Sequence, residues 1–213
     1  MDKTDRQIKD REKILIYSAQ KFHKEGFYKT SMDEIAKELC VSKKTIYKHF
    51  PSKENLLEEI CSHTTNEIYN NVDIIVDGDG NVVFKFVKLL NMYSNYTLNI
   101  SDKWLHDLKI HHPEILKTIN HNRTFKINGI LNKLITQGIK EKLIENYPPQ
   151  IIISAFIHSI SGVMNPEFLI NNKFTMQIAF KTTYEMLLNG ILTGSGKKIF
   201  KKEKSLLAKE IKL

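Results

Sequence analysis

Apolar side chains recur along most of the chain at the spacing of an α-helix. In residues 5–25 the apolar positions Ile8, Leu15 and Phe22 share one helical face, and Gly26 ends the pattern. Later apolar stripes predict helices over residues 83–93, 104–108, 113–137, 149–164 and 174–191. No alternation of apolar and polar residues longer than four residues suggests a strand. We therefore predict an all-α fold.

Two short helices are predicted close together near the N-terminus. Overlapping capping boxes at Thr30 and Ser31 begin the first of them, and Ser42 can cap the second. Ser52 then caps a fourth, longer helix that we expect to continue without a break beyond residue 71. Two short helices separated by a tight turn are typical of a helix-turn-helix.

The composition narrows the class of protein. The chain has 213 residues, of which 41% are hydrophobic and 26% charged, so it can bury a core and is not a disordered or collagen-like sequence. The two cysteines suggest a reducing compartment, and the charged N-terminal segment is unlike a signal peptide. The apolar stretch 151–164 is too short to span a bilayer. We expect a cytoplasmic protein with no membrane partner.

The positive charge is unevenly distributed. The formal net charge is +8, and residues 195–213 contribute seven lysines against two glutamates. Residues 41–53 contain Lys43, Lys44, Lys48 and Lys53 and no acidic residue. Such a cluster is either a solvated surface or a surface that neutralises phosphates.

The predicted third helix separates its residues into two faces. At 100° per residue, Ile46 and Phe50 point to the core, and the opposite face carries Lys44, Thr45, Tyr47 and Lys48. In a major groove, lysine can bind guanine or phosphate, threonine a thymine methyl, and tyrosine a backbone oxygen. Lysines at the starts of two helices also oppose the helix dipole, which favours a bound anion there. The pattern therefore predicts DNA binding.

The stretch from Thr30 to Leu57, TSMDEIAKELCVSKKTIYKHFPSKENLL, resembles the DNA-binding domain of TetR-type transcriptional regulators. The resemblance implies a homodimer that binds double-stranded operator DNA, with a ligand-binding domain after the helix-turn-helix. It also implies that Lys43, Lys44, Thr45, Tyr47 and His49 face the groove, and that Thr30, Lys48 and Lys53 contact phosphates.

Two residues depart from the family pattern. Cys40 stands where many members have glycine, so we expect a left-handed backbone at a non-glycine residue. Lys44 stands where a small residue is common, which changes the expected set of base contacts.

We divide the chain into three parts. Residues 1–51 form the DNA-binding domain, residues 52–196 the effector-binding and dimerisation domain, and residues 197–213 a basic tail or extra helix. The first helix of the second domain is expected to be continuous with the DNA-binding domain. The tail can also be disordered or bind DNA or a membrane.

The second domain offers two sets of candidate residues. A pocket for an apolar or amphipathic effector, or simply the bundle core, is predicted from Phe86, Leu90, Tyr93, Trp104, Leu108, Phe125, Asn128, Phe156 and Ile160. The last two strong helices have more apolar surface than one core face requires, which indicates a partner. By resemblance to the family, the dimer interface is expected at Phe156, Ile160, Phe180, Tyr184, Leu187, Leu188 and Ile191.

Other candidate sites have simpler explanations. His49 is as consistent with a boundary residue as with a phosphate ligand, and Tyr47 could instead be a partly buried aromatic. Cys40 can fill a tight turn as well as sense oxidants. Histidines 106, 111, 112 and 121 lack the i, i+4 spacing of a helical metal site, so we expect neither a metal nor a cofactor.

The resulting prediction is a ligand-responsive transcriptional regulator, most simply a repressor released from a pseudo-palindromic operator by a small molecule. No catalytic motif is present, so we do not expect an enzyme. The alternative is a helical carrier or scaffold that binds an apolar ligand but no specific DNA.

Overall fold

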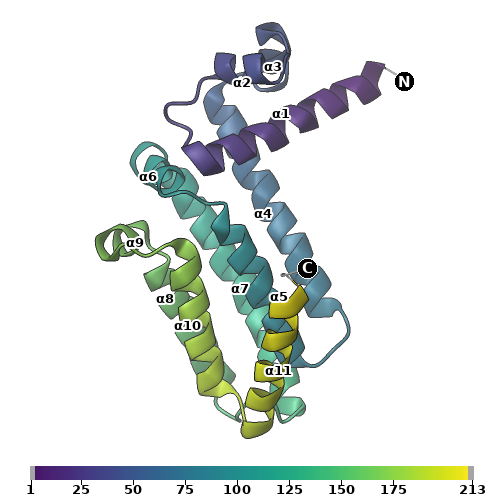
Figure 1. Cartoon of the computed structure of the whole chain (residues 1–213), viewed down its shortest axis with the longest axis vertical. Coiled ribbons are helices and arrows are strands. Elements are labelled where there is room, and N and C mark those ends of the chain that lie inside the picture. The colour runs from purple at the N-terminus through teal and green to yellow at the C-terminus, as the bar shows by residue number, and fades with distance from the viewer. Residues whose placement is uncertain (1–2, 211–213) are drawn as a thin grey trace. The chain divides into compact units, whose positions relative to one another are not determined.

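The structure is a computed structural model that describes residues 3–210, and eleven α-helices cover most of that range (Figure 1). The helices are α1 (Lys3–Glu25), α2 (Met32–Glu38), α3 (Lys43–His49), α4 (Lys53–Asp77), α5 (Val82–Leu98), α6 (Asp102–His111), α7 (Pro113–Lys140), α8 (Pro149–Val163), α9 (Pro166–Asn172), α10 (Met176–Ile191) and α11 (Gly194–Glu210). Within residues 3–210 the only β-type pairing is an isolated bridge between Ile144 and Leu192. The predicted all-α fold is confirmed.

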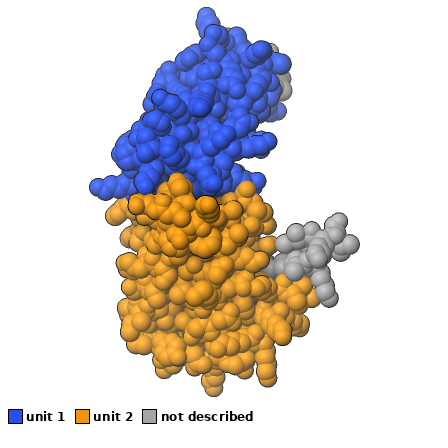
Figure 2. Space-filling view, turned by 60° about the vertical axis from the view of Figure 1, so that its left-hand side comes forward, with its two compact units in different colours: residues 1–69, 99–119 blue, residues 70–98, 120–213 orange. Residues whose placement is uncertain are grey.

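The chain forms two compact units, shown in different colours in Figure 2. Unit 1 contains residues 1–69 and 99–119, and unit 2 contains residues 70–98 and 120–213. This division differs from the expected boundary at residue 51, because α6 and the start of α7 pack with the N-terminal helices. Both α4 and α7 begin in unit 1 and continue into unit 2.

Unit 1 is built around the apolar faces of its N-terminal helices. Ile14 and Phe22 of α1, Ile35 of α2, Ile46 of α3 and Leu56 of α4 are all completely buried. The short helices α2 and α3 depend on this shared core, because a helix of seven residues is not stable alone in water.

Unit 2 has an aromatic core where α5, α8 and α10 meet. Phe86 of α5 packs against Phe156 of α8 and Tyr184 of α10, with ring centres 6.4 and 6.3 Å apart. The Tyr184 hydroxyl donates a 3.0 Å hydrogen bond to the Phe86 carbonyl oxygen, which satisfies a buried polar group. Figure 1 shows α8 and α10 side by side, joined through the short α9.

Most of the expected helices are present, and the structure adds details. The helix after Ser52 is continuous through Asp77, as predicted. The tail forms α11, which packs against α5 with Phe200 buried, so the extra-helix interpretation holds for its described residues. The short α9, which begins at Pro166 and is capped by Asn165, was not predicted.

Candidate nucleic-acid interface

Side-chain caps fix the starts of both helices of the helix-turn-helix. The Ser31 hydroxyl accepts a 3.1 Å hydrogen bond from the Glu34 amide, and the Glu34 carboxylate accepts one from the Ser31 amide. This is one of the two predicted capping boxes. Ser42 accepts a 3.0 Å hydrogen bond from the Thr45 amide at the start of α3. Between the helices, Cys40 has φ = 54°, the expected left-handed conformation.

The two faces of α3 are separated as the helical spacing predicted. Ile46 is fully buried, and Phe50, which caps the helix, is also fully buried. Lys44 and Lys48 are exposed, and the Tyr47 side chain between them is 45% exposed. Among the described residues, neither lysine forms an ion pair with an acidic side chain. The exposed face therefore presents two uncompensated positive charges beside an aromatic hydroxyl.

The other candidates on α3 are already engaged within the protein. Lys43 forms an ion pair with Asp33 of α2, and this hydrogen bond raises the pKa of the lysine. The Thr45 hydroxyl lies 2.8 Å from the Ser42 hydroxyl, and the residue is half-buried. His49 is also half-buried. A DNA contact by Lys43 would compete with the ion pair that links α2 to α3.

Two residues expected on phosphates form hydrogen bonds with the protein's own backbone. Thr30 is buried, and its hydroxyl donates a 3.0 Å hydrogen bond to the Gly26 carbonyl oxygen. The Lys53 ammonium donates a 2.8 Å hydrogen bond to the Tyr28 carbonyl oxygen and lies 5.9 Å from the centre of the Phe27 ring. Partial burial lowers the pKa of Lys53. Both side chains stabilise the loop of residues 26–30. The buried Thr30 hydroxyl is therefore engaged within the protein, whereas a phosphate contact by the half-exposed Lys53 stays a prediction.

Helix α6 also contacts the loop of residues 26–30, and this contact was not predicted from the sequence. The Asp107 carboxylate accepts a 2.8 Å hydrogen bond from the Tyr28 amide, and the His111 ring stacks on the Tyr28 ring at 3.9 Å. Gly26 has φ = 82°, and a Cβ atom there would lie 2.6 Å from the Asp107 carboxylate. A larger residue at this turn would be strained at this φ and would have to move the Asp107 side chain.

Aromatic packing extends the contact between α6 and the N-terminal helices. Trp104 lies edge-on to the Phe27 ring at 5.7 Å and to the His23 ring at 4.7 Å. Burial lowers the pKa of His23 to about 4, so this imidazole is neutral at neutral pH. Trp104 was assigned to an effector pocket from the sequence, but it belongs to the core of unit 1.

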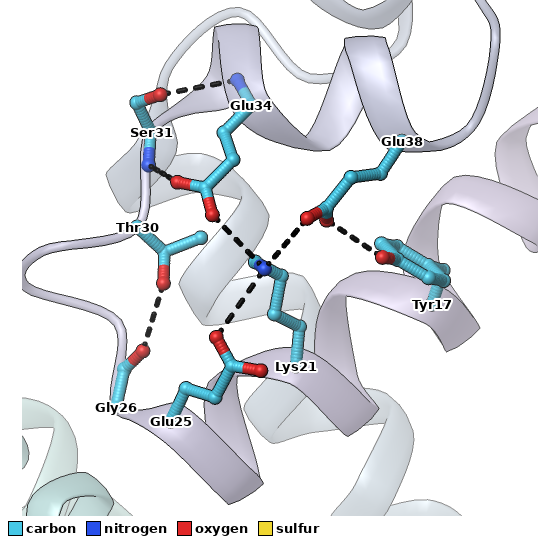
Figure 3. Close-up of polar contacts among 8 residues, drawn as sticks. All are labelled: Tyr17, Lys21, Glu25, Gly26, Thr30, Ser31, Glu34 and Glu38. Carbon is cyan, nitrogen blue, oxygen red and sulfur yellow. Dashed lines mark hydrogen bonds and ion pairs between the residues drawn. The ribbon is translucent and has the colours of Figure 1, made fainter.

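One ammonium group connects α1 to α2 (Figure 3). Lys21 of α1 lies 3.0 Å from a carboxylate oxygen of both Glu34 and Glu38 of α2, and 3.3 Å from Glu25 of its own helix. Glu38 also accepts a 2.6 Å hydrogen bond from the Tyr17 hydroxyl. The Lys21 side chain is only 9% exposed, and its pKa is raised, first by the hydrogen bond to Glu34.

The nine expected pocket residues are divided between the two units. Phe86, Leu90 and Phe156 are buried in unit 2, where Tyr93 also stacks with Phe180. Trp104 and Leu108 instead belong to unit 1. The Phe125 side chain is 82% exposed, Asn128 is exposed and Ile160 is half-exposed. The helical spacing identified apolar faces correctly for several of these residues, but it did not show which unit each face packs into.

The expected dimer residues are mostly part of the chain's own core. Ile160 and Leu187 are partly exposed, whereas the others are buried within unit 2: Phe156, Phe180, Tyr184, Leu188 and Ile191. The exposed apolar residues of α8 and α10 are Ile151, Ile178 and Met186, with exposures of 66%, 53% and 69%. None of these three residues is among those expected in the dimer interface from the sequence.

The structure also bears on metals and membranes. Across the part of the chain that is described, no three histidine, cysteine or acidic side chains come together as metal ligands. His111 stacks on Tyr28, and His112 lies 3.3 Å from the Glu114 carboxylate. Of the helices within residues 3–210, none is both long and apolar enough to cross a bilayer.

Comparisons with known proteins agree with this architecture. Residues 14–60 match the family model described as bacterial regulatory proteins, tetR family. The HTH-type transcriptional regulator YvaF of Bacillus subtilis strain 168 is 26% identical over 180 residues, covering 84% of this chain and 94% of YvaF.

Solved structures share the fold. A transcriptional regulator from Cytophaga hutchinsonii ATCC 33406 superposes with a TM-score of 0.69 at 22% identity, covering 85% of this chain and 98% of the other. The SmeT–triclosan complex superposes with a TM-score of 0.62 at 13% identity, covering 87% of this chain and 92% of SmeT.

Proposed function

Because the chain belongs to the TetR family of transcriptional regulators, we propose that it is a repressor that binds a pseudo-palindromic operator as a homodimer and leaves it when a small molecule binds. The observation that carries the proposal is the exposed face of α3. Lys44, Tyr47 and Lys48 are presented together, while Ile46 anchors the helix in the core. The activity proposed is DNA binding in the cytoplasm, without catalysis.

The chemistry of the α3 face supports binding in a major groove. Lys44 can donate to guanine O6 and N7, Tyr47 can donate its hydroxyl to a backbone oxygen, and Lys48 can bind a phosphate. A homodimer presents two copies of α3 related by two-fold symmetry. The operator half-sites should then be one helical turn of DNA or a multiple of it apart, ~10 bp per turn.

The interior of unit 2 supports an apolar or amphipathic effector. The side chains where α5, α8 and α10 meet are aromatic, and the Tyr184 hydroxyl is already bonded to a backbone carbonyl. SmeT, which shares this fold, forms a complex with triclosan. A ligand that inserts among these rings has to separate them, which would shift α5 or α8.

The contacts of α6 suggest how unit 1 would respond. Asp107 and His111 of α6 hold the loop at Tyr28, and α2 follows this loop directly. A displacement of α6 would therefore alter the position of α2 and, through the ion pair of Asp33 with Lys43, of α3. The effector would act by changing the separation of the two recognition helices.

The exposed apolar side chains of α8 and α10 support self-association. A homodimer interface buries matching surfaces related by a two-fold axis, and two helices from each chain can form a four-helix arrangement. Ile151, Ile178 and Met186 would lie in this interface, in place of the buried residues named from the sequence.

The test is DNA binding by the intact protein at a stated salt concentration. Fluorescence anisotropy should show preferential binding to a palindrome in the DNA upstream of the chain's own gene, compared with a shuffled duplex of equal length. A double variant, Lys44→Ala/Lys48→Ala, should lose most of this preference. Equal binding of the wild type to both duplexes, together with binding of an apolar dye, would favour the carrier alternative instead.

A further inference from the structure

We infer that Lys21 is a positioning residue for DNA recognition, because its ammonium group fixes both ends of α2 to α1 and thereby sets the orientation of α3. The inference rests on the proposed function, since it concerns how the helix-turn-helix is held for operator binding. Lys21 lies on α1 and would not need to touch DNA. Figure 3 shows its ammonium group between carboxylates of both helices.

The contacts of Lys21 reach the first and the last turn of α2. Glu34 is in the first turn, where its carboxylate also accepts the Ser31 amide in the capping box. Glu38 is the last residue of α2 and is held from its other oxygen by Tyr17 of α1. One cation therefore ties α2 to α1 at two points along its length, in addition to the apolar packing of Met32, Ile35 and Ala36.

The charge balance makes this arrangement dependent on the ammonium group. Three carboxylates, from Glu25, Glu34 and Glu38, converge on one Lys21 side chain that is 9% exposed. Without the positive charge, these carboxylates would repel one another across the space between α1 and α2. The repulsion would push the helices apart, because two of the carboxylates belong to α2 and one to α1.

A shift of α2 is transmitted to the recognition helix. Asp33 of α2 pairs with Lys43 of α3, and the Val41 amide donates a 3.0 Å hydrogen bond to the Ala36 carbonyl oxygen. The two helices therefore move as a pair. A small rotation of the pair relative to α1 would change how Lys44 and Tyr47 enter the groove. In a dimer this change of orientation would occur at both half-sites.

The first test compares variants of the full chain in operator binding. Lys21→Met should weaken operator affinity at least about ten-fold, because it removes the charge but keeps much of the apolar stem. Lys21→Arg should bind within about two-fold of the wild type, because a guanidinium group can bond the same carboxylates. Lys24→Met removes an exposed charge from the same helix and should be nearly neutral. In Lys21→Met/Glu38→Gln, removal of one carboxylate should restore about three-fold in affinity.

The second test does not require DNA. Amide hydrogen exchange in α2 should be about ten-fold faster in Lys21→Met than in the wild type, and unchanged in Lys24→Met. If the wild type shows no operator preference, the proposed function fails while the exchange rates still decide whether Lys21 fixes α2. If Lys21→Met does not fold by circular dichroism, Glu34→Gln/Glu38→Gln replaces it, with faster exchange in α2 again expected.

Two results would overturn the inference. The first is that Lys21→Met, or the variant that replaces it, has the same amide exchange rates in α2 and the same operator affinity as Lys24→Met. The other is equal losses for Lys21→Met and Lys21→Arg, because packing of the stem, and not the charge, would then be responsible.

Discussion

Cys40 has a left-handed backbone conformation in the turn between α2 and α3, at φ = 54°. This conformation is unfavourable by about 1 kcal/mol for a residue with a Cβ atom, whereas glycine adopts it without strain. We expect Cys40→Gly to raise the free energy of unfolding by roughly 0.5 to 1 kcal/mol in urea denaturation. Cys40→Ala keeps the strain and should bring no such gain. Equal stability of the two variants would show that the turn is not strained.

Lys44 and Lys48 lie on the exposed face of α3 but are predicted to have different roles. If Lys44 reads a base, Lys44→Ala should cost roughly 1–3 kcal/mol per half-site on the operator and much less on random DNA. If Lys48 binds a phosphate, Lys48→Ala should weaken both DNAs by similar factors and reduce the slope of log affinity against log salt by about one unit per subunit. Equal losses on both DNAs for Lys44→Ala would make it a phosphate contact as well.

At the residue scale, the sequence predicted the faces of α3 but not the roles of Thr30 and Lys53. Helical periodicity decides that Ile46 is buried and that Tyr47 is exposed, because both follow from 100° per residue. Thr30 and Lys53 depend instead on the path of the loop of residues 26–30, which brings carbonyl oxygens within their reach. Side-chain partners of this kind follow from tertiary packing, which no local pattern encodes.

The packing of α1 against α6 predicts a pH dependence of stability. The pKa of His23 is lowered to about 4 from 6.5, so the folded state disfavours its protonation. The unfolded chain binds the proton more readily, and the contribution of His23 to stability is lost as the pH falls from about 6.5 to about 4. The lowered pKa corresponds to a loss of about 3 kcal/mol in the free energy of unfolding once the pH is below about 4.

His23→Gln provides the comparison for this pH dependence. Unfolding can be followed through Trp104, the chain's only tryptophan, which packs against His23. The wild type should lose stability between pH 6.5 and pH 4 more steeply than His23→Gln, whose side chain does not titrate. Parallel stability curves for the two proteins would mean that His23 is accessible to water in the folded state.

At the element scale, the strongest sequence signals were apolar periodicity and capping chemistry. Ser31, Ser42 and Ser52 each accept a hydrogen bond from a backbone amide three residues later, at the start of α2, α3 and α4. The short α9 was missed, because its seven residues are too few to show a period.

For the whole molecule, self-association can be tested at the exposed apolar side chains of α8 and α10. Met186 is 69% exposed, so Met186→Arg should fold normally but place a charge in the proposed interface, giving monomers by light scattering. Ile74 of α4 is 70% exposed and lies in the same unit, so Ile74→Arg is a matched control that should stay dimeric. A dimer of Met186→Arg would place the interface elsewhere. Leu188 is fully buried, and a charge there would test folding and not assembly.

The division into units was the feature least accessible from sequence. Residues 99–119 join the N-terminal unit although they follow α5 of unit 2 in the chain. The apolar face of α6 predicts only that Trp104 and Leu108 are buried somewhere, since many partners could satisfy the same burial. The expected pocket therefore combined residues from two different cores.

The contact between the loop of residues 26–30 and α6 also has a consequence for the order in which the chain folds during synthesis. Tyr28 and its partner Asp107 are 79 residues apart in sequence. At ~5–20 residues per second, a ribosome needs roughly 4–16 s to add that length. During this interval Phe27 has its earlier partners Phe22 and Lys53 but lacks Trp104, whose ring packs on it in the folded protein. The loop that precedes α2 is thus translated early but gains its contacts with α6 only when α6 leaves the ribosome.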